Sequence, residues 1–365
     1  MDPMPWLADL PNEMIAGLDP LGLDHFFEKL PRVNTEKCVD ALRTTAGLLG
    51  CQPGFHAPMD DPHALAAMRD LGFLAGSLQY QGVSVADEFP ELHDRMRALG
   101  RQVHMVPRDT VLHYTVWNPA DARRRTFTGD PQERRLIEVT GAAVHHVEEA
   151  IRALSEAART DPATRRFAHL CTVAAEALEA SARYVLLPDS GLDPVHFATV
   201  MRFYFEPMLI ADAQYHAPAA AQVPLYLVDQ IVRGYEYDGP EQGVFRESLA
   251  LYGLPRWRQT FRDACRRSSL LSTVERAHRD YSGARSARVR ESAEALGLVL
   301  RALTVFRGRH RRVVRTAYAE SIRSYTVGSA GADVAVLDTI LGSTRACAHA
   351  LGAMTNAPGC TGNAA

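Results

Sequence analysis

The chain has 365 residues, of which 47% are apolar and 23% are charged, and its formal net charge is −3. This balance is typical of a globular protein with a large buried core, and the length is sufficient for two structural units. The slightly acidic charge argues against a general nucleic-acid binder, because such proteins carry basic surfaces.

The N-terminal residues and the hydropathy of the chain indicate the cellular compartment of the protein. Residues 1–19 lack the basic segment and apolar run of a secretory signal, and no apolar stretch approaches the roughly 20 residues of a membrane span. We therefore expect a cytoplasmic protein that contacts no membrane. The six cysteines are widely scattered, so we expect reduced thiols and no Cys-x-x-Cys centre.

Helical patterns cover most of the chain. Asp-Pro pairs at 61–62, 130–131, 161–162 and 193–194 indicate helix starts, because aspartate caps the first turn and proline fits into it. The expected helices are a segment from Asp61 to near Gly82 and residues 131–158, 163–187, 194–205, 244–252, 256–270, 287–325 and 333–354.

Strand signals are weak. The segment Val111–Trp117 is the best strand candidate, because it is rich in β-branched and aromatic residues, but it is too isolated to predict a sheet. The fold class is therefore predicted to be all-α. We expect a small N-terminal helical domain with its connection at residues 1–130 and a large helical domain at residues 131–365.

Common enzyme motifs are absent from the sequence, including nucleotide-binding glycine loops, the His-Glu-x-x-His zinc motif and the Gly-x-Ser-x-Gly nucleophile motif. The adjacent pair His145 and His146 diverges by about 100° on a helix, so the two rings do not readily share one metal ion. Glu148 and Glu149 are expected to be solvated helix charges.

The segment Leu296–Tyr318 carries the strongest functional signal. His310 lies on its apolar stripe, four residues after Phe306 and four before Val314, so its imidazole is expected to face the interior. An inward-facing imidazole in an apolar slot can ligate haem iron, and nearby arginines can pair with the haem propionates. The other stripe residues are Leu296, Leu300, Leu303, Val313 and Ala317, and the surrounding arginines are Arg307, Arg309, Arg311, Arg312 and Arg315.

The spacing of these residues alone also allows a purely structural role for His310 and the arginines, and it favours that role over haem binding. A histidine on an apolar helix face is more often a core residue bonded to a carbonyl, and an arginine-rich helix is more often a solvated surface.

The residues around His310 resemble a known family. Residues 303–318 (LTVFRGRHRRVVRTAY) and 328–333 (GSAGAD) are similar to the proximal-histidine helix and glycine loop of the indoleamine 2,3-dioxygenase superfamily. The branch represented by monodechloroaminopyrrolnitrin synthase is the most similar. Further blocks follow in the same order, at residues 111–119 (VLHYTVWNP), 126–129 (TFTG), 202–207 (RFYFEP) and 223–226 (VPLY).

The resemblance implies a cofactor site in the large helical domain. It makes His310 the ligand of haem b, bound without thioether links because the chain has no Cys-x-x-Cys-His. Arg307 matches a family arginine on the proximal side of the haem. Phe306 and Val314, on the same stripe, are expected to pack the macrocycle.

The resemblance also implies a substrate site. Phe197 packs an indole ring, Arg202 binds a carboxylate, and Ser329 takes the place of a loop threonine that bonds the substrate. Tyr318 matches a pocket tyrosine of the pyrrolnitrin branch, and His113 is a pocket candidate through its block. Two alternatives stay open: His113 as a buried structural residue, and Arg202 paired with Glu206 four residues later.

The expected function is therefore a haem oxygenase that uses dioxygen on tryptophan or a halogenated or otherwise modified tryptophan, in bacterial secondary metabolism. An external electron donor is a possible partner, and no nucleic acid is expected. Three alternatives remain: oxidation of a non-indole amine or amino acid on the same scaffold, a non-catalytic haem or gas-binding protein, and an arginine cluster that binds phosphate or nucleic acid without haem.

Overall fold

The computed structural model describes residues 4–186, 192–238, 240–319, 325, 327–328, 330–331, 333 and 335–356. The described part is built almost wholly of helices, so the all-α prediction is confirmed. The first helices are α1 (Asn12–Gly17), α2 (Asp24–Thr35), α3 (Val39–Gly50), α4 (Asp61–Tyr80), α5 (Val85–Glu88), α6 (Pro90–Gln102) and α7 (Val111–Tyr114). The later helices are α8 (Pro131–Ala157), α9 (Arg165–Leu186), α10 (Pro194–His196), α11 (Leu225–Val232), α12 (Pro240–Ala250), α13 (Pro255–Cys265), α14 (Leu270–Asp280), α15 (Gly283–Ala317) and α16 (Ala335–Asn356).

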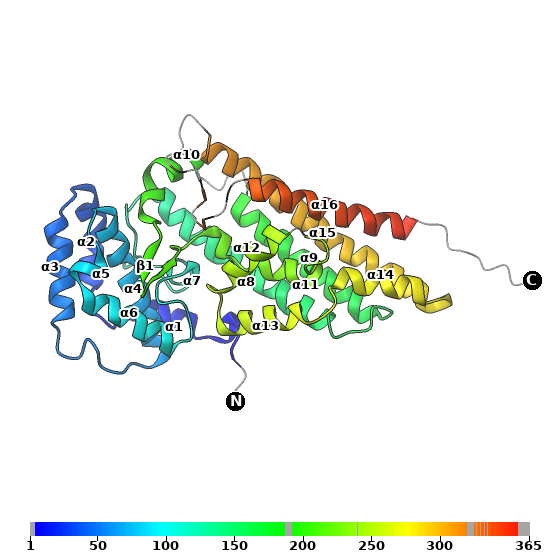
Figure 1. The fold of residues 1–365 in the computed structure, drawn as a ribbon, viewed down its shortest axis with the longest axis horizontal. Helices are drawn as coiled ribbons and strands as arrows, with labels where there is room; N and C mark the ends of the chain where they lie inside the picture. The colour runs from blue at the N-terminus through cyan, green and yellow to red at the C-terminus, as the bar shows by residue number, and fades with distance from the viewer. Residues whose placement is uncertain are drawn as a thin grey trace, which may run out of the picture.

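Four long helices form the body of the molecule. Helix α9 packs against both α8 and α15, and α16 packs along α15 (Figure 1). Helices α1 to α6 gather at the opposite end, and α4 is almost entirely buried among them. The buried apolar side chains form one continuous core that extends through both groups. The domain boundary near residue 130 stays a prediction.

The Asp-Pro pairs act largely as expected. The Asp130 carboxylate accepts a hydrogen bond from Gln132 N at 2.7 Å, and α8 begins at Pro131. The Asp193 carboxylate accepts one from Val195 N at 2.8 Å at the start of α10. The other two starts differ by one or two residues, because Asp60 rather than Asp61 caps α4 and α9 begins at Arg165.

Two expectations about secondary structure are wrong. Residues 111–114 form the short helix α7 instead of a strand, and their apolar side chains are buried in the core. Within the described residues the sheet is a hairpin of β1 (Met208–Ile210) and β2 (Ala213–Tyr215), which no sequence signal predicted. The helix expected at 287–325 ends at Ala317.

The expectation that Glu148 is solvated is also wrong. Its side chain is buried, and the carboxylate accepts hydrogen bonds from Leu7 N at 2.6 Å, Ala8 N at 2.8 Å and Trp257 Nε1 at 2.8 Å. Glu148 therefore ties the N-terminal segment and α13 to α8. None of the helices in the described part of the chain has the length and apolar character that crossing a membrane requires.

Replacing Glu148 by Gln should lower the free energy of unfolding by about 2–4 kcal/mol, because three buried donors lose their anionic acceptor. Chemical denaturation measures this loss. The matched control is Glu149→Gln on the exposed face of the same helix, which should change stability by no more than about 0.5 kcal/mol. Equal effects of the two substitutions would contradict the anchoring role of Glu148.

Candidate active site

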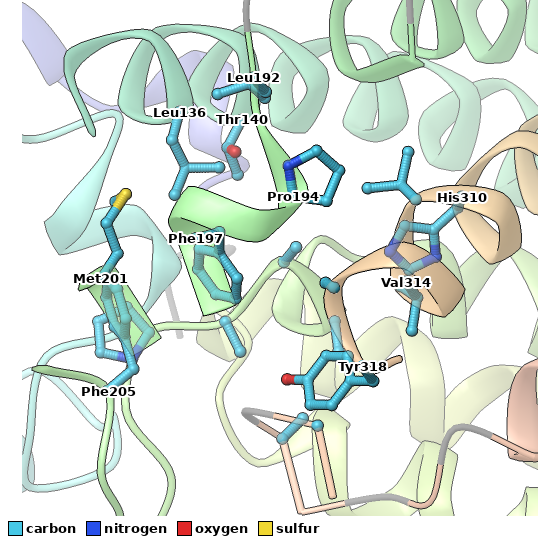
Figure 2. A pocket seen from close by; sticks show the side chains of 18 of the residues that line it. Leu136, Thr140, Leu192, Pro194, Phe197, Met201, Phe205, His310, Val314 and Tyr318 are labelled. Atoms are coloured by element: carbon cyan, nitrogen blue, oxygen red, sulfur yellow. The ribbon is translucent and has the colours of Figure 1, made fainter. Parts of the chain in front are cut away.

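A cavity of about 230 Å³ lies between α8, the segment Pro194–Phe205 and the C-terminal end of α15 (Figure 2). Residues 218–221 and the start of α16 complete its wall. The lining is mostly apolar, and its larger side chains include Leu136, Val139, Phe197, Met201, Phe205, Val313, Val314 and Leu337. A cavity with this apolar lining suits an aromatic ligand.

His310 reaches this cavity from α15 (Figure 2). Burial lowers the pKa of its imidazole to about 4, so the ring is neutral at physiological pH. Among the described residues, no group forms a hydrogen bond with it, and its ring contact is with Phe306, at 6.0 Å between centroids. A neutral imidazole with a free nitrogen is the form that binds a metal.

Val314 and Tyr318 follow His310 along the same face of α15. Both line the cavity, and Figure 2 shows the Tyr318 hydroxyl pointing into the space between α15 and the segment that carries Phe197. The structure thus places His310, Val314 and Tyr318 on one wall of the cavity. Phe306 contacts the His310 ring but is not part of the cavity wall.

Arg307 lies away from the cavity wall. Its guanidinium is buried, pairs with the Asp229 carboxylate of α11 and donates a hydrogen bond to the Thr344 hydroxyl of α16. Burial alone would raise the pKa of Asp229, but Arg233 and Arg307 lower it to about 2. Arg307 therefore connects α15 to α11 and α16.

The helix expected at residues 194–205 contains a π-helical turn. After α10, residues Phe197–Met201 form this turn, in which Arg202 N donates to Phe197 O, and residues Arg202–Tyr204 continue as a 3₁₀ turn. Phe197 lines the cavity and stacks on Phe205 at 6.2 Å between centroids. Turns of this kind are rare and frequently occur at functional sites.

Arg202 is buried and does not line the cavity. Its Nη1 donates to Phe205 O at 2.9 Å and lies 3.7 Å from the Glu206 carboxylate, and its guanidinium sits 3.9 Å from the centre of the Tyr325 ring. The pairing with Glu206, which the sequence left open as an alternative, is present. Phe197 and Arg202 therefore do not both reach the cavity.

His113 is a core residue. Its side chain is buried, its Nδ1 accepts a hydrogen bond from Thr110 N at 3.0 Å, and its ring meets Trp117 edge-on at 4.8 Å. Its neighbours Val111 and Tyr114 line the cavity in its place. Burial, assisted by the charge of Arg69, lowers the pKa of His113 to about 3.

The glycine loop contributes Gly328, Ala330 and Asp333 to the cavity wall, while Ser329 lies outside the described residues. Gly331 has a φ of 77°, and a Cβ there would lie 2.5 Å from His216 Cε1. The Gly331 backbone therefore packs directly against the His216 side chain of the protein, and only glycine fits there.

Several polar wall residues were not predicted. Gln132 and Thr140 come from α8, and Asp193 and Asp333 are the charged residues among the described lining. The Gln132 side chain accepts a hydrogen bond from Asp193 N at 2.6 Å, which joins the starts of α8 and α10. The sequence placed Gln132, Asp193 and Asp333 near helix starts and Thr140 within a helix, but without the fold nothing indicated a shared cavity.

His113 should make the fold sensitive to acid. Its folded pKa of about 3 lies below the ordinary 6.5, so the unfolded chain takes up the proton first. Stability is then complete above pH 6.5 and is lost as pH falls, by about 2–3 kcal/mol at pH 4.5. Urea unfolding at pH 7 and 4.5 measures the loss, which should shrink in His113→Gln but persist in the exposed control His25→Gln. An equal loss in His113→Gln would contradict this assignment.

The donor set at the cavity fits haem. The described residues contain no group of three or more His, Cys, Asp or Glu side chains that could hold a bare metal ion. A single histidine facing apolar walls suits iron whose other ligands come from a macrocycle.

An all-helical protein with one inward imidazole at an apolar cavity has the arrangement of the helical haem oxygenases. The comparison with protein families agrees, because the model described as "Monodechloroaminopyrrolnitrin synthase PrnB" matches residues 55–348. The chain belongs to this family. The family consists of haem-dependent oxygenases of pyrrolnitrin biosynthesis, so the chain is an enzyme and the predicted branch is confirmed.

Proposed function

We propose that this enzyme binds haem b through His310 and oxidises tryptophan or a modified tryptophan with dioxygen. The observation that carries the proposal is the His310 imidazole, which is neutral, faces the apolar cavity and lacks a hydrogen-bond partner among the described residues. When bound, the haem supplies the dioxygen chemistry.

The residues of α15 would hold the cofactor. Val314 lies one turn after His310 in the cavity wall, where it can pack the macrocycle. Phe306 lies one turn before and restricts the orientation of the His310 ring. Arg307, proposed on the proximal side, acts through its ion pair with Asp229, which fixes α15.

The opposite wall would hold the substrate. The Phe197 ring can pack against an indole, and the Tyr318 hydroxyl can form a hydrogen bond with the substrate across the cavity. Ser329 is proposed as a further hydrogen-bond donor on the resemblance of its loop. Orientation of this kind lowers a reaction barrier by several kcal/mol. Ring cleavage, insertion of one oxygen atom and rearrangement with decarboxylation would all start from this complex.

Replacing His310 by Ala should abolish the stoichiometric haem uptake of the wild type, because no other side chain is proposed to ligate the iron. The Soret band of the purified ferrous protein measures uptake, and added imidazole should restore it. The matched control is His349→Ala, an exposed histidine on α16, which should keep the wild-type spectrum. An unchanged spectrum in His310→Ala would remove this residue from the site.

A second candidate function is the oxidation of an amine that lacks a carboxylate. Two observations favour it. Arg202, proposed for the substrate carboxylate, is already engaged by Phe205 O, Glu206 and Tyr325. The charged residues of the described cavity wall, Asp193 and Asp333, would attract an ammonium group rather than a carboxylate.

Ligand titrations test whether Arg202 recognises the carboxylate of the substrate. Because Arg202 is engaged within the protein, we expect tryptophan and tryptamine to bind the ferric enzyme with Kd values within about tenfold of each other. Difference spectra in the Soret region measure both constants. A preference for tryptophan of about a hundredfold or more, lost in Arg202→Gln, would instead assign this guanidinium to the substrate carboxylate.

A further inference from the structure

A stack of aromatic rings connects the cavity with the surface. Tyr114 lines the cavity, and its ring lies 6.3 Å from Phe127, at 20° between the planes. Phe127 lies 4.8 Å from Tyr204 at 16°, and Tyr204 lies 4.2 Å from Tyr80 at 32°. We call Tyr114, Phe127, Tyr204 and Tyr80 the ring stack. Its first three members are buried, whereas Tyr80, the last residue of α4, is half-buried.

The inner end of the ring stack has a proton acceptor. The Tyr114 hydroxyl donates to the Glu133 carboxylate at 3.2 Å. Glu133 is held in place by Phe127 N at 2.8 Å and by the Thr128 amide and hydroxyl, both at 2.7 Å. Burial raises the pKa of Glu133. A phenol that loses an electron becomes strongly acidic, so a fixed carboxylate beside it can take the proton and later return it.

The outer end has a second pair of phenols. Tyr204 and Tyr80 share a side-chain hydrogen bond, and burial raises the pKa of Tyr204. The buried Tyr204 is therefore protonated before it is oxidised. Tyr80 is the member of the ring stack that can release a proton to solvent, because its side chain is partly exposed.

We propose that the ring stack carries oxidising equivalents from the cavity to the surface. The inference rests on the proposed function, because an oxygenase turnover that fails to oxidise its substrate supplies the oxidant. Tyr114 gives one electron to the oxidant and its phenolic proton to Glu133. Tyr204 then gives an electron through Phe127 to Tyr114, and Glu133 returns the proton to Tyr114. The phenolic proton of Tyr204 passes across its hydrogen bond to Tyr80, which releases its own proton to water.

Tyr80 completes the sequence. It returns an electron and a proton to Tyr204 across their hydrogen bond, which leaves a radical on Tyr80. A hydrogen-atom donor in solution, such as a thiol or ascorbate, restores the phenol. One oxidant thus gains one electron and one donor molecule loses one hydrogen atom, while the buried residues end unchanged.

The same cluster contains a built-in control. Phe73 packs on Tyr114 at 5.6 Å and on Phe127 at 4.6 Å, but it continues to Phe27 at 6.2 Å and so to a branch without a hydroxyl. Phe73→Leu alters the packing of the cluster and leaves all three phenols of the ring stack in place. It therefore distinguishes the effect of disturbed packing from the effect of removing a phenol from the ring stack.

Radical trapping tests the proposal. Haem-loaded ferric enzyme without substrate is treated with hydrogen peroxide and a nitroso spin trap, and mass spectrometry locates the adducts. We expect an adduct on Tyr80 that ascorbate suppresses. Tyr204→Phe should lose the Tyr80 adduct and retain one on Tyr114, whereas Phe73→Leu should keep the wild-type pattern.

The outcomes distinguish the two proposals. Enzyme with an intact Soret band but no Tyr80 adduct would overturn the ring stack as a route, and so would a Tyr80 adduct that survives in Tyr204→Phe. A protein that takes up no haem would overturn the proposed function, and the ring stack with it, because the oxidant would then have no source. Far-UV circular dichroism confirms that each variant is folded.

Discussion

The buried ion pair between Asp229 of α11 and Arg307 of α15 fixes the helix on which the active site depends. Both charged groups are buried away from water, and this is stable only when each has an oppositely charged, hydrogen-bonded partner. Arg233 binds the same carboxylate at 3.1 Å and reaches Asp238 at 2.9 Å, and Asp238 in turn pairs with Arg246 of α12. Because Arg307 lies one turn before His310, this chain of charges sets the rotation of α15 and thereby the direction of the imidazole.

The parts of the fold that follow from local chemistry were predicted from the sequence. Asp130 and Asp193 cap helices at the expected positions, and the apolar spacing of α15 placed His310 and Val314 on the cavity side. These features depend on residues only a few positions apart. The short helix α7 was missed because the β-branched and aromatic residues of Val111–Trp117 reflect burial, which a strand and a buried helix share.

The remaining features depend on contacts between distant residues. Asp229 and Arg307 are 78 positions apart, so no local pattern could reveal that this arginine is held within the protein. Glu148 was expected in solvent because its donors, Leu7 and Trp257, come from both sides of α8 in the chain. The resemblance assigned Phe197 and Arg202 to one substrate site, but the segment between them contains a π-helical turn and only Phe197 lines the cavity.

The π-helical turn at Phe197–Met201 has a consequence for relatives of differing length. An α-helix that gains one residue rotates everything on one side of the insertion by about 100° unless a wider turn absorbs it. Loss of one residue here would convert the turn to ordinary helix without disturbing the helical hydrogen bonds on either side. The residues on one side of the turn would then be rotated relative to those on the other side, so a single codon deletion would alter which side chains face the cavity while leaving the neighbouring helices in place.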